Sequence, residues 1–278
     1  MRKILSVVTL LAILSSCSVK PEKTGMTWEK YRIDAHRTGV TAPNADNVPE
    51  ALGTIAGDGS YTAPNGKVFT DGTVPAVAAI LVDSQKNMAE VKEVIAYSTR
   101  FMTTELPESA LSNFVVDIVA SETQRLTGNK VDVGVTNFGG IRVDMPEGDV
   151  QLDDIRSMFP FKNNLVWVQL SGTALLRLMN EIAEYGPQCV SGVQMVISDH
   201  KLESVLVGGK PIDPKKKYGV ATVDFLLDGG DHIHVAQGAS KLVITDHIVG
   251  DVIEQYIRNL TAEGKPIEYH TDGRVVLK

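Results

Sequence analysis

The sequence predicts an α+β fold in which a mixed sheet is packed against helices. Three observations lead to this prediction: strand and helix patterns interleave irregularly from about residue 84 onward, two neighbouring strand patterns form a hairpin, and no internal repeat is present. A doubly wound parallel sheet would alternate strands and helices regularly. The 278 residues are 43% hydrophobic and 22% charged, which is typical of a globular chain that can bury a full core.

The first periodic segments predict two helices. Apolar residues at helical spacing between Met88 and Met102 predict the first helix. The second is framed at both ends, because Ser109 can cap its start and Gly128 follows its end. Between them, residues 111–119 carry an apolar stripe at helical spacing.

The remaining elements follow in order along the chain. Strands are expected where apolar and β-branched residues run together or alternate, and helices where apolar residues recur every three or four positions. The expected strands are 131–135, 165–170, 193–197 with 204–207 as a hairpin, 218–223 and 275–277, and the expected helices are a short one between Asp153 and Pro160, 172–184 and 248–260.

The N-terminal residues predict the compartment. A positively charged start is followed by an apolar run too short to span a bilayer, and Leu-Ser-Ser-Cys ending at Cys17 resembles the lipobox of bacterial lipoproteins. We therefore expect residues 1–16 to be a lipoprotein signal peptide. Cys17 would carry the lipid that anchors the chain in the cell envelope, on the periplasmic or outer-surface side. A plain cleaved signal peptide is the alternative.

Residues 17–84 are weakly patterned. They carry several prolines among Gly, Asn, Asp and Thr, which form turns rather than helices. We expect either a tether with short strands or a small lobe packed on the main domain, which we place at residues 85–278. Nothing in residues 17–84 indicates chemistry.

Three loops at strand ends could form a binding site. Residues 137–142 contain paired glycines, which let backbone approach a ligand closely, followed by Arg142, whose planar guanidinium suits phosphate or carboxylate. Residues 159–163 and 225–231 each place a phenylalanine among polar residues, and two such rings could stack on a planar heterocycle. Taken singly, each loop is a weak signal, because a phenylalanine after a strand usually packs in the core and paired glycines usually form a turn.

Taken together and in order, these blocks resemble the 5'-nucleotidase C-terminal domain family. The matching blocks are 108–113, 136–142, 160–163 with the strand 165–170, 207–213, 221–225 and 229–231. Each block alone is unspecific, but all of them fall in family order within residues 85–278. The resemblance implies a 5'-nucleotidase C-terminal domain-like, substrate-binding domain over that range.

The resemblance also implies roles for individual residues. Arg142 matches the arginine that contacts the substrate in the family. Phe161 and Phe225 match the two rings that clamp the base. Asn163 and Asp231 match residues that hold the base or the ribose. The complete set of expected substrate-binding residues is Asn137, Gly139, Gly140, Arg142, Phe161, Asn163, Phe225, Gly230 and Asp231.

Two departures from the family pattern concern the phosphate end of the site. Lys162 replaces the glycine that is usual in its block, so this loop is expected to bend differently. Family members also use further arginines upstream of residue 108, and here only Arg100 lies nearby, in a register that does not fit. The expected contacts to the base are therefore better supported than those to phosphate.

The sequence offers no motif for a metal centre. In the family, hydrolysis belongs to an N-terminal metallophosphoesterase domain, whose two metal ions need clustered Asp, His and Asn ligands. Asp34 and His36 fit an Asp-x-His pattern without a partner motif, and His232 with His234 has no third ligand in sequence. We expect these two histidines to line the pocket mouth. We also expect no catalytic residue and no metal or other cofactor on this chain, with divalent metals on a partner domain.

Three functions remain open. The chain could be the nucleotide- or nucleoside-binding part of a split 5'-nucleotidase whose metals come from a separately encoded metallophosphoesterase, and this is the function we favour. It could instead be a non-catalytic surface lipoprotein that captures nucleosides or nucleotides. A purely structural role is disfavoured because the expected ligand residues occur together. A net charge of −7 and the absence of a Lys/Arg stripe argue against binding a nucleic-acid polymer.

The lipid anchor can be tested by substitution. Cys17→Ala should give an unprocessed precursor, or a product cut elsewhere, that takes up no labelled fatty acid, because the acylated thiol is removed. N-terminal sequencing and metabolic labelling measure both effects. Mature wild-type protein that begins at any other residue would contradict the assignment.

Overall fold

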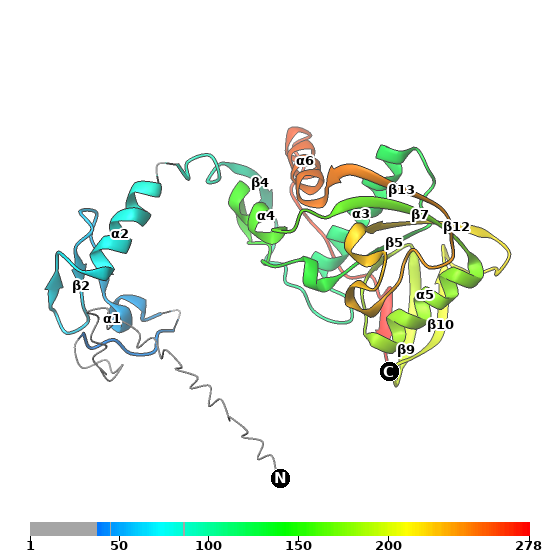
Figure 1. Cartoon of the computed structure of the whole chain (residues 1–278), viewed down its shortest axis with the longest axis horizontal. Helices are drawn as coiled ribbons and strands as arrows, with labels where there is room; N and C mark the ends of the chain where they lie inside the picture. The colour runs from blue at the N-terminus through cyan, green and yellow to red at the C-terminus, as the bar shows by residue number, and fades with distance from the viewer. Residues whose placement is uncertain (1–37, 45, 86) are drawn as a thin grey trace, which may run out of the picture. The chain divides into compact units, whose positions relative to one another are not determined.

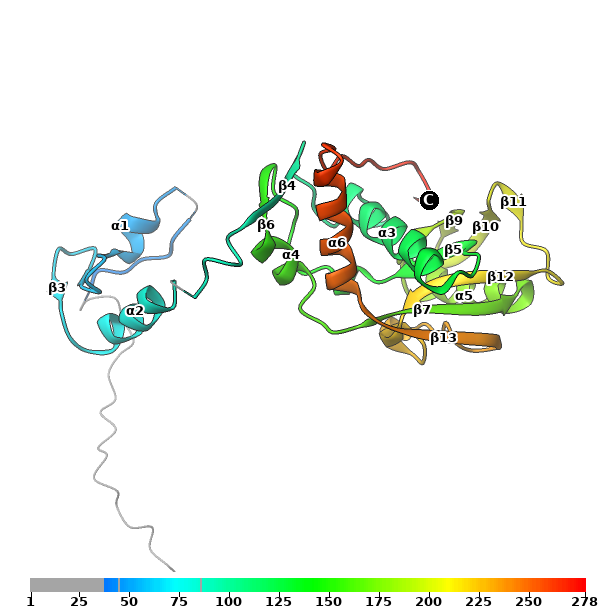
Figure 2. The same ribbon diagram turned by 90° about the horizontal axis from the view of Figure 1, so that it is seen from above.

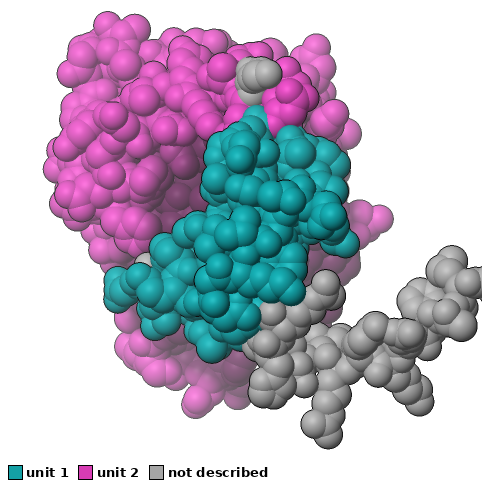
Figure 3. Space-filling model, turned by 90° about the vertical axis from the view of Figure 1, so that its left-hand side faces the viewer, with its two compact units in different colours: residues 1–82 teal, residues 83–278 magenta. Residues whose placement is uncertain are grey.

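The computed structural model describes residues 38–44, 46–85 and 87–278, which belong to two compact units, Met1–Val82 and Asp83–Lys278 (Figures 1 and 3). The predicted signal peptide, Cys17 and the Asp-x-His triplet at 34–36 lie outside the described residues. In the part of the chain that is described, no helix has the length and apolar character needed to cross a membrane.

The first unit is built from short elements. Its three strands form an antiparallel sheet in the order β1-β2-β3, in which the rings of Tyr61 and Phe69 stack with centroids 5.9 Å apart. The sequence predicts short strands here, whereas the two helices were not expected. The elements are α1 (Val48–Leu52), β1 (Thr54–Ile55), β2 (Tyr61–Thr62), β3 (Val68–Phe69) and α2 (Thr73–Ser84).

The prediction of a helix between Met88 and Met102 is wrong. The structure has strand β4 (Val94–Ser98) there, paired antiparallel with β6 (Gly148–Gln151). The spacing of apolar residues in this segment fits both the helical period of about 3.6 residues and the strand period of two. β-branched Val94 and Ile95 favour a strand, and pairing with a partner distant in sequence decides between the two.

Helix α3 (Ala110–Thr127) agrees with its prediction at both ends. The Ser109 hydroxyl accepts from the Ser112 N–H while the Ser112 hydroxyl accepts from the Ser109 N–H, so the two residues form a capping box. At the other end, Gly128 adopts φ 67°, a left-handed conformation that costs glycine little. Local chemistry therefore determines where this helix begins and ends.

The second unit has a five-stranded mixed sheet in the order β13-β7-β12-β5-β8, which confirms the predicted α+β class. Strands β5 and β12 run parallel, and the other neighbours are antiparallel. Helices α3 and α5 (Gly172–Tyr185) both pack on the central strands, which lie side by side in Figure 1. The strands are β5 (Val133–Thr136), β7 (Asn164–Ser171), β8 (Cys189–Ser191), β12 (Lys217–Val223) and β13 (Ala239–Ile248).

A smaller sheet in the order β11-β10-β9-β14 contains the predicted hairpin, which turns at Asp199 and His200 with positive φ at both residues, as tight hairpins require. Helix α6 packs beside α3 and α4 (Figure 2). The remaining elements are α4 (Leu152–Met158), β9 (Val193–Ser198), β10 (Lys201–Val207), β11 (Lys210–Pro211), α6 (Val249–Ala262) and β14 (Val275–Leu277).

A buried arginine ties the C-terminal segment to the core. The side chain of Arg274 is 10% exposed and donates to both carboxylate oxygens of Asp117, at 2.8 and 3.0 Å, to Asp272, and to the carbonyl of Val190 at 3.0 Å. Burial alone would lower the pKa of Arg274, but the hydrogen bonds to Asp272 and Asp117 outweigh burial and raise it. The hydrogen bond with Arg274 lowers the pKa of Asp272.

Arg274→Met should lower the free energy of unfolding at pH 7 by about 2–3 kcal/mol, because it removes the cationic partner of Asp117, which keeps only the hydrogen bond from the Tyr269 hydroxyl. The pKa of Asp272 is lower in the folded chain than in the unfolded one, so its contribution is present above about pH 4 and is lost as pH falls through the folded-state pKa. The variant should therefore lose less stability on acidification than wild type does.

Urea denaturation at pH 7 and at lower pH measures both effects. Arg125→Met is the control, because Arg125 pairs with Glu122 on the exposed side of α3, and its removal should change stability by less than about 0.5 kcal/mol. Equal losses in the two variants would contradict the role given to Arg274.

Candidate functional site

The three predicted loops meet at one edge of the five-stranded sheet. Because β12 runs parallel to β5, both strands end at this edge, and antiparallel β7 begins there. The backbone N–H and the side-chain amide of Asn164 each donate to Asp224 Oδ2 at 3.1 Å, which joins the start of β7 to the end of β12. The sheet topology therefore brings together loops that lie far apart in sequence.

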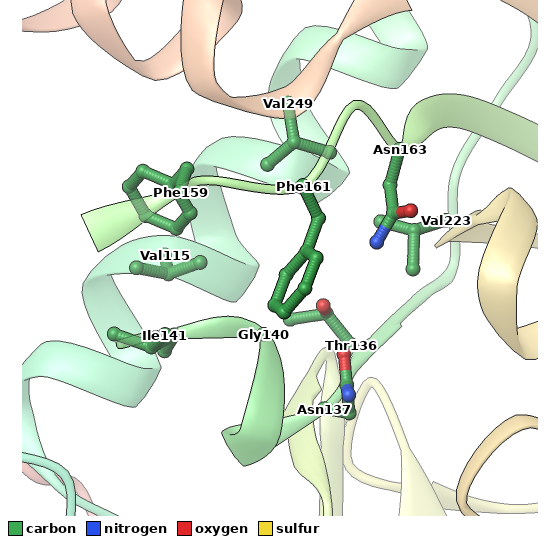
Figure 4. Close-up of a pocket in the computed structure, with 10 residues that line it drawn as sticks. All are labelled: Val115, Thr136, Asn137, Gly140, Ile141, Phe159, Phe161, Asn163, Val223 and Val249. Atoms are coloured by element: carbon green, nitrogen blue, oxygen red, sulfur yellow. The ribbon is translucent and has the colours of Figure 1, made fainter. Parts of the chain in front are cut away.

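A cavity opens between two of these loops and helix α3 (Figure 4). It encloses about 20 Å³, which is room for about one water molecule, so a base would have to lie on the open side of Phe161. Phe161 is 49% exposed. Four predicted residues line the cavity, Asn137, Gly140, Phe161 and Asn163, together with Val115, Thr136, Ile141, Phe159, Val223 and Val249.

Asn137 links two of the loops. It is 6% exposed, and its Nδ2 donates to Asp231 Oδ2 at 2.8 Å. A side chain at Gly140 would place Cβ 2.9 Å from Asn137 Oδ1, and Gly139 lies beside the same contact, so the paired glycines leave room for this amide. In the structure Asn137 thus orients Asp231, a role that the family blocks did not indicate.

Phe225 and Gly230 form the other side of the edge. A Cβ at Gly230 would lie 2.2 Å from the Phe225 carbonyl oxygen and 2.9 Å from its ring, so only glycine fits. Phe225 is 47% exposed and does not line the cavity. Phe161 and Phe225 lie on loops at the same edge of the sheet. Among the described residues, their two rings are not in contact.

Arg142 is the basic side chain of the predicted set. Its backbone N–H donates to the Met158 carbonyl at 3.0 Å, and its Nη1 donates to the Gly139 carbonyl at 3.3 Å. The side chain is exposed and forms no ion pair with any described residue, so its charge is available to an anion. Lys162, where the family has glycine, is also exposed.

The two histidines near the site contact helix α5. The ring of His232 stacks on Tyr185 with centroids 5.4 Å apart, and His234 Nδ1 lies 3.7 Å from Glu181 Oε2. Within residues 38–44, 46–85 and 87–278, no group of three or more His, Cys, Asp or Glu side chains could hold a metal ion. The contacts with α5 were not predicted, because only the folded chain brings that helix beside the loop.

The chain is similar to part of several longer proteins, among them UshA, an apyrase and 5'-nucleotidases. The family described as 5'-nucleotidase, C-terminal domain, matches residues 88–238. Protein UshA of Escherichia coli (strain K12) is 30% identical over 146 residues, which cover 51% of this chain and 26% of UshA. An apyrase of Tabanus yao is 27% identical over 242 residues, which cover 75% of this chain and 43% of the apyrase. The chain thus spans between a quarter and a half of these relatives.

Solved structures share the fold. A 5'-nucleotidase precursor from Thermus thermophilus matches 73% of this chain with a TM-score of 0.63 and 24% identity, over 43% of its own length. The NAD nucleotidase of Haemophilus influenzae matches 79% of this chain with a TM-score of 0.56 and 16% identity, over 48% of its own length. At these identities the likeness establishes the fold alone.

Proposed function

The chain belongs to the 5'-nucleotidase C-terminal domain family, and we propose that it is the nucleotide- or nucleoside-binding part of a split 5'-nucleotidase. A separately encoded metallophosphoesterase would supply the metals and the hydrolysis of the phosphomonoester. The observation that carries the proposal is the gathering of the three predicted loops at one sheet edge, with the cavity and two half-exposed phenylalanine rings beside it.

The base and the ribose would bind at this edge. A half-exposed ring such as Phe161 or Phe225 offers a stacking face to a heterocycle, which is worth about 1–3 kcal/mol per base. Asp231, oriented by Asn137, could accept hydrogen bonds from ribose hydroxyls, and Asn163 could bond the edge of the base.

The phosphate would be held by Arg142. Its guanidinium is exposed and forms no ion pair with a described residue, and a planar fork of N–H donors matches phosphate oxygens. A single arginine holds phosphate less firmly than a site with several cations. Most of the charge on the phosphate would therefore be neutralised by the metals of the partner.

The metals belong on a partner in this proposal because hydrolysis between two metal ions needs a cluster of Asp, His and Asn ligands. The described residues offer no such group. The residues of this chain would bind and orient the substrate, and the partner would activate water. Anchoring through lipid on Cys17 would keep the complex in the cell envelope.

One observation favours a second function, the non-catalytic capture of nucleosides or nucleotides at the cell surface. The side chains that line the cavity are all uncharged. A ligand lying over the open side of Phe161 would meet this uncharged surface, which suits a neutral nucleoside as well as it suits the base of a nucleotide.

Calorimetric titration tests the ligand. The chain should bind adenosine and AMP with dissociation constants of about 10⁻⁵–10⁻³ M. Phe161→Ala and Phe225→Ala should each lose about 1–3 kcal/mol of binding free energy, and Arg142→Ala should weaken AMP more than adenosine. Phe101→Ala is the control, since Phe101 is 58% exposed and lies outside the three loops. If both loop variants unfold, or if neither alters binding, the rings do not form a nucleoside site.

Hydrolysis tests the split enzyme. The purified chain should release no phosphate from AMP with magnesium, manganese, zinc or cobalt, whereas a complex captured from native membranes should do so and should show a higher KM when it contains Phe161→Ala. A captured complex without phosphatase activity would favour the surface-binding function. Metal-dependent activity that co-purifies with the chain alone and is lost on substitution of His232 or His234 would overturn both.

A further inference from the structure

The loop after β12 has an unfavourable backbone at the predicted ligand residue Asp231 and at the residue that follows it. Asp231 and His232 adopt φ 48° and 64°, in the left-handed region that non-glycine residues rarely occupy. Each such residue costs on the order of 1–3 kcal/mol unless its surroundings hold it in place. The loop must therefore be held by contacts beyond its own short turns. The hydrogen bond from Asn137 to Asp231 and the burial of Ile233 supply some of these contacts.

Helix α5 supplies other contacts to the loop through a paired arginine and glutamate. Arg177 Nη2 donates to the carbonyls of His234 at 2.7 Å and Gln237 at 3.2 Å. Glu181 Oε2 accepts from the backbone N–H of His234 at 2.9 Å, and its other oxygen pairs with Arg177 Nη1. The backbone N–H and the carbonyl of His234 are thus both hydrogen-bonded to one ion pair on the helix.

A ring contact extends the same face of α5. Tyr185 stacks on His232, with an angle of 28° between the rings. Arg177, Glu181 and Tyr185 are spaced four residues apart, so they follow one stripe of the helix. The apolar face of α5, which includes the buried Leu178 and Ile182, packs in the core. The polar stripe therefore contacts the loop while other residues of α5 hold the helix in place.

We propose that Arg177 and Glu181 are positioning residues of the ligand site. They touch no ligand, and they act by holding the loop of residues 224–237 in the conformation that presents Phe225 and Asp231. The effect on affinity rests on the proposed nucleoside site, whereas the effect on the loop does not. Loss of the ion pair would let the strained backbone at Asp231 relax. The ligand would then have to order the loop on binding, and the entropy lost in ordering it would weaken the binding free energy.

Hydrogen exchange on the 278-residue chain tests the effect on the loop without ligand. Arg177→Met should accelerate exchange of the amides in residues 229–237, and the conservative Arg177→Lys should restore part of the protection because its ammonium can still donate to the two carbonyls. Glu181→Gln is a second variant in case Arg177→Met does not fold. Arg258→Met is the matched control, since Arg258 pairs with Glu254 at the same spacing and similar exposure on α6. It should leave these amides unchanged.

Adenosine titration by NMR tests the effect on the site. Arg177→Met should weaken binding about tenfold, whereas the same change in an Asp231→Ala background should weaken it less, since part of the effect of Arg177 acts through Asp231 and the rest through Phe225. Equal losses in both backgrounds, or unchanged exchange in residues 229–237, would overturn the positioning role. If wild type binds no adenosine, the proposed function fails, and the exchange result still decides whether α5 holds the loop.

Discussion

The candidate site depends on the parallel pairing of β12 with β5. Val220 pairs with Val133 in the same direction, so the two strands end at one edge, and antiparallel β7 starts at that edge because it runs the other way. Parallel strands need a long connection between them, and here that connection contains the loop of residues 159–163 as well as β7 itself. One choice of strand direction thus delivers three loops to one place. Had β12 run antiparallel to β5, the block around Phe225 would lie at the opposite end of the sheet.

Once the strand ends are together, polar contacts between the loops determine the shape of the site. Asp224 accepts two hydrogen bonds from Asn164, and Asp231 accepts one from the nearly buried Asn137. Breaking the hydrogen bond of Asn137 would cost free energy, because its largely buried amide would be left without a partner. The glycines at 139 and 140 leave the space that the amide of Asn137 occupies. The sheet therefore places the three loops next to one another, and the hydrogen bonds between the loops orient their side chains.

The sequence predicts elements that depend on interactions between residues close together in the chain, and it fails where distant residues decide the structure. Helix α3 was predicted at both ends because Ser109 and Gly128 act on residues three or four positions away. Strand β4 was missed because its pairing with β6, more than fifty residues later, overrides an ambiguous apolar spacing. Edge strand β13 was missed because it is exposed on both faces and shows no clean alternation. The same rule holds at the site: family blocks indicated the loop residues, but the contacts of Arg177 with the loop depend on how α5 packs.

The exposed rings argue for a ligand more strongly than the motifs alone do. Phe161 and Phe225 are each about half exposed, at 49% and 47%, although full burial of a phenylalanine side chain would stabilise the chain by about 1.5–3 kcal/mol. Scattered exposed apolar residues are ordinary on protein surfaces, so one such ring would need no explanation. Two of them lie on loops at the same sheet edge as Arg142, which has no ion-pair partner among the described residues, and Asp231, whose φ is positive. Stability alone favours none of these features, whereas the proposed nucleotide could stack on a ring, pair its phosphate with the guanidinium and donate its hydroxyls to the carboxylate.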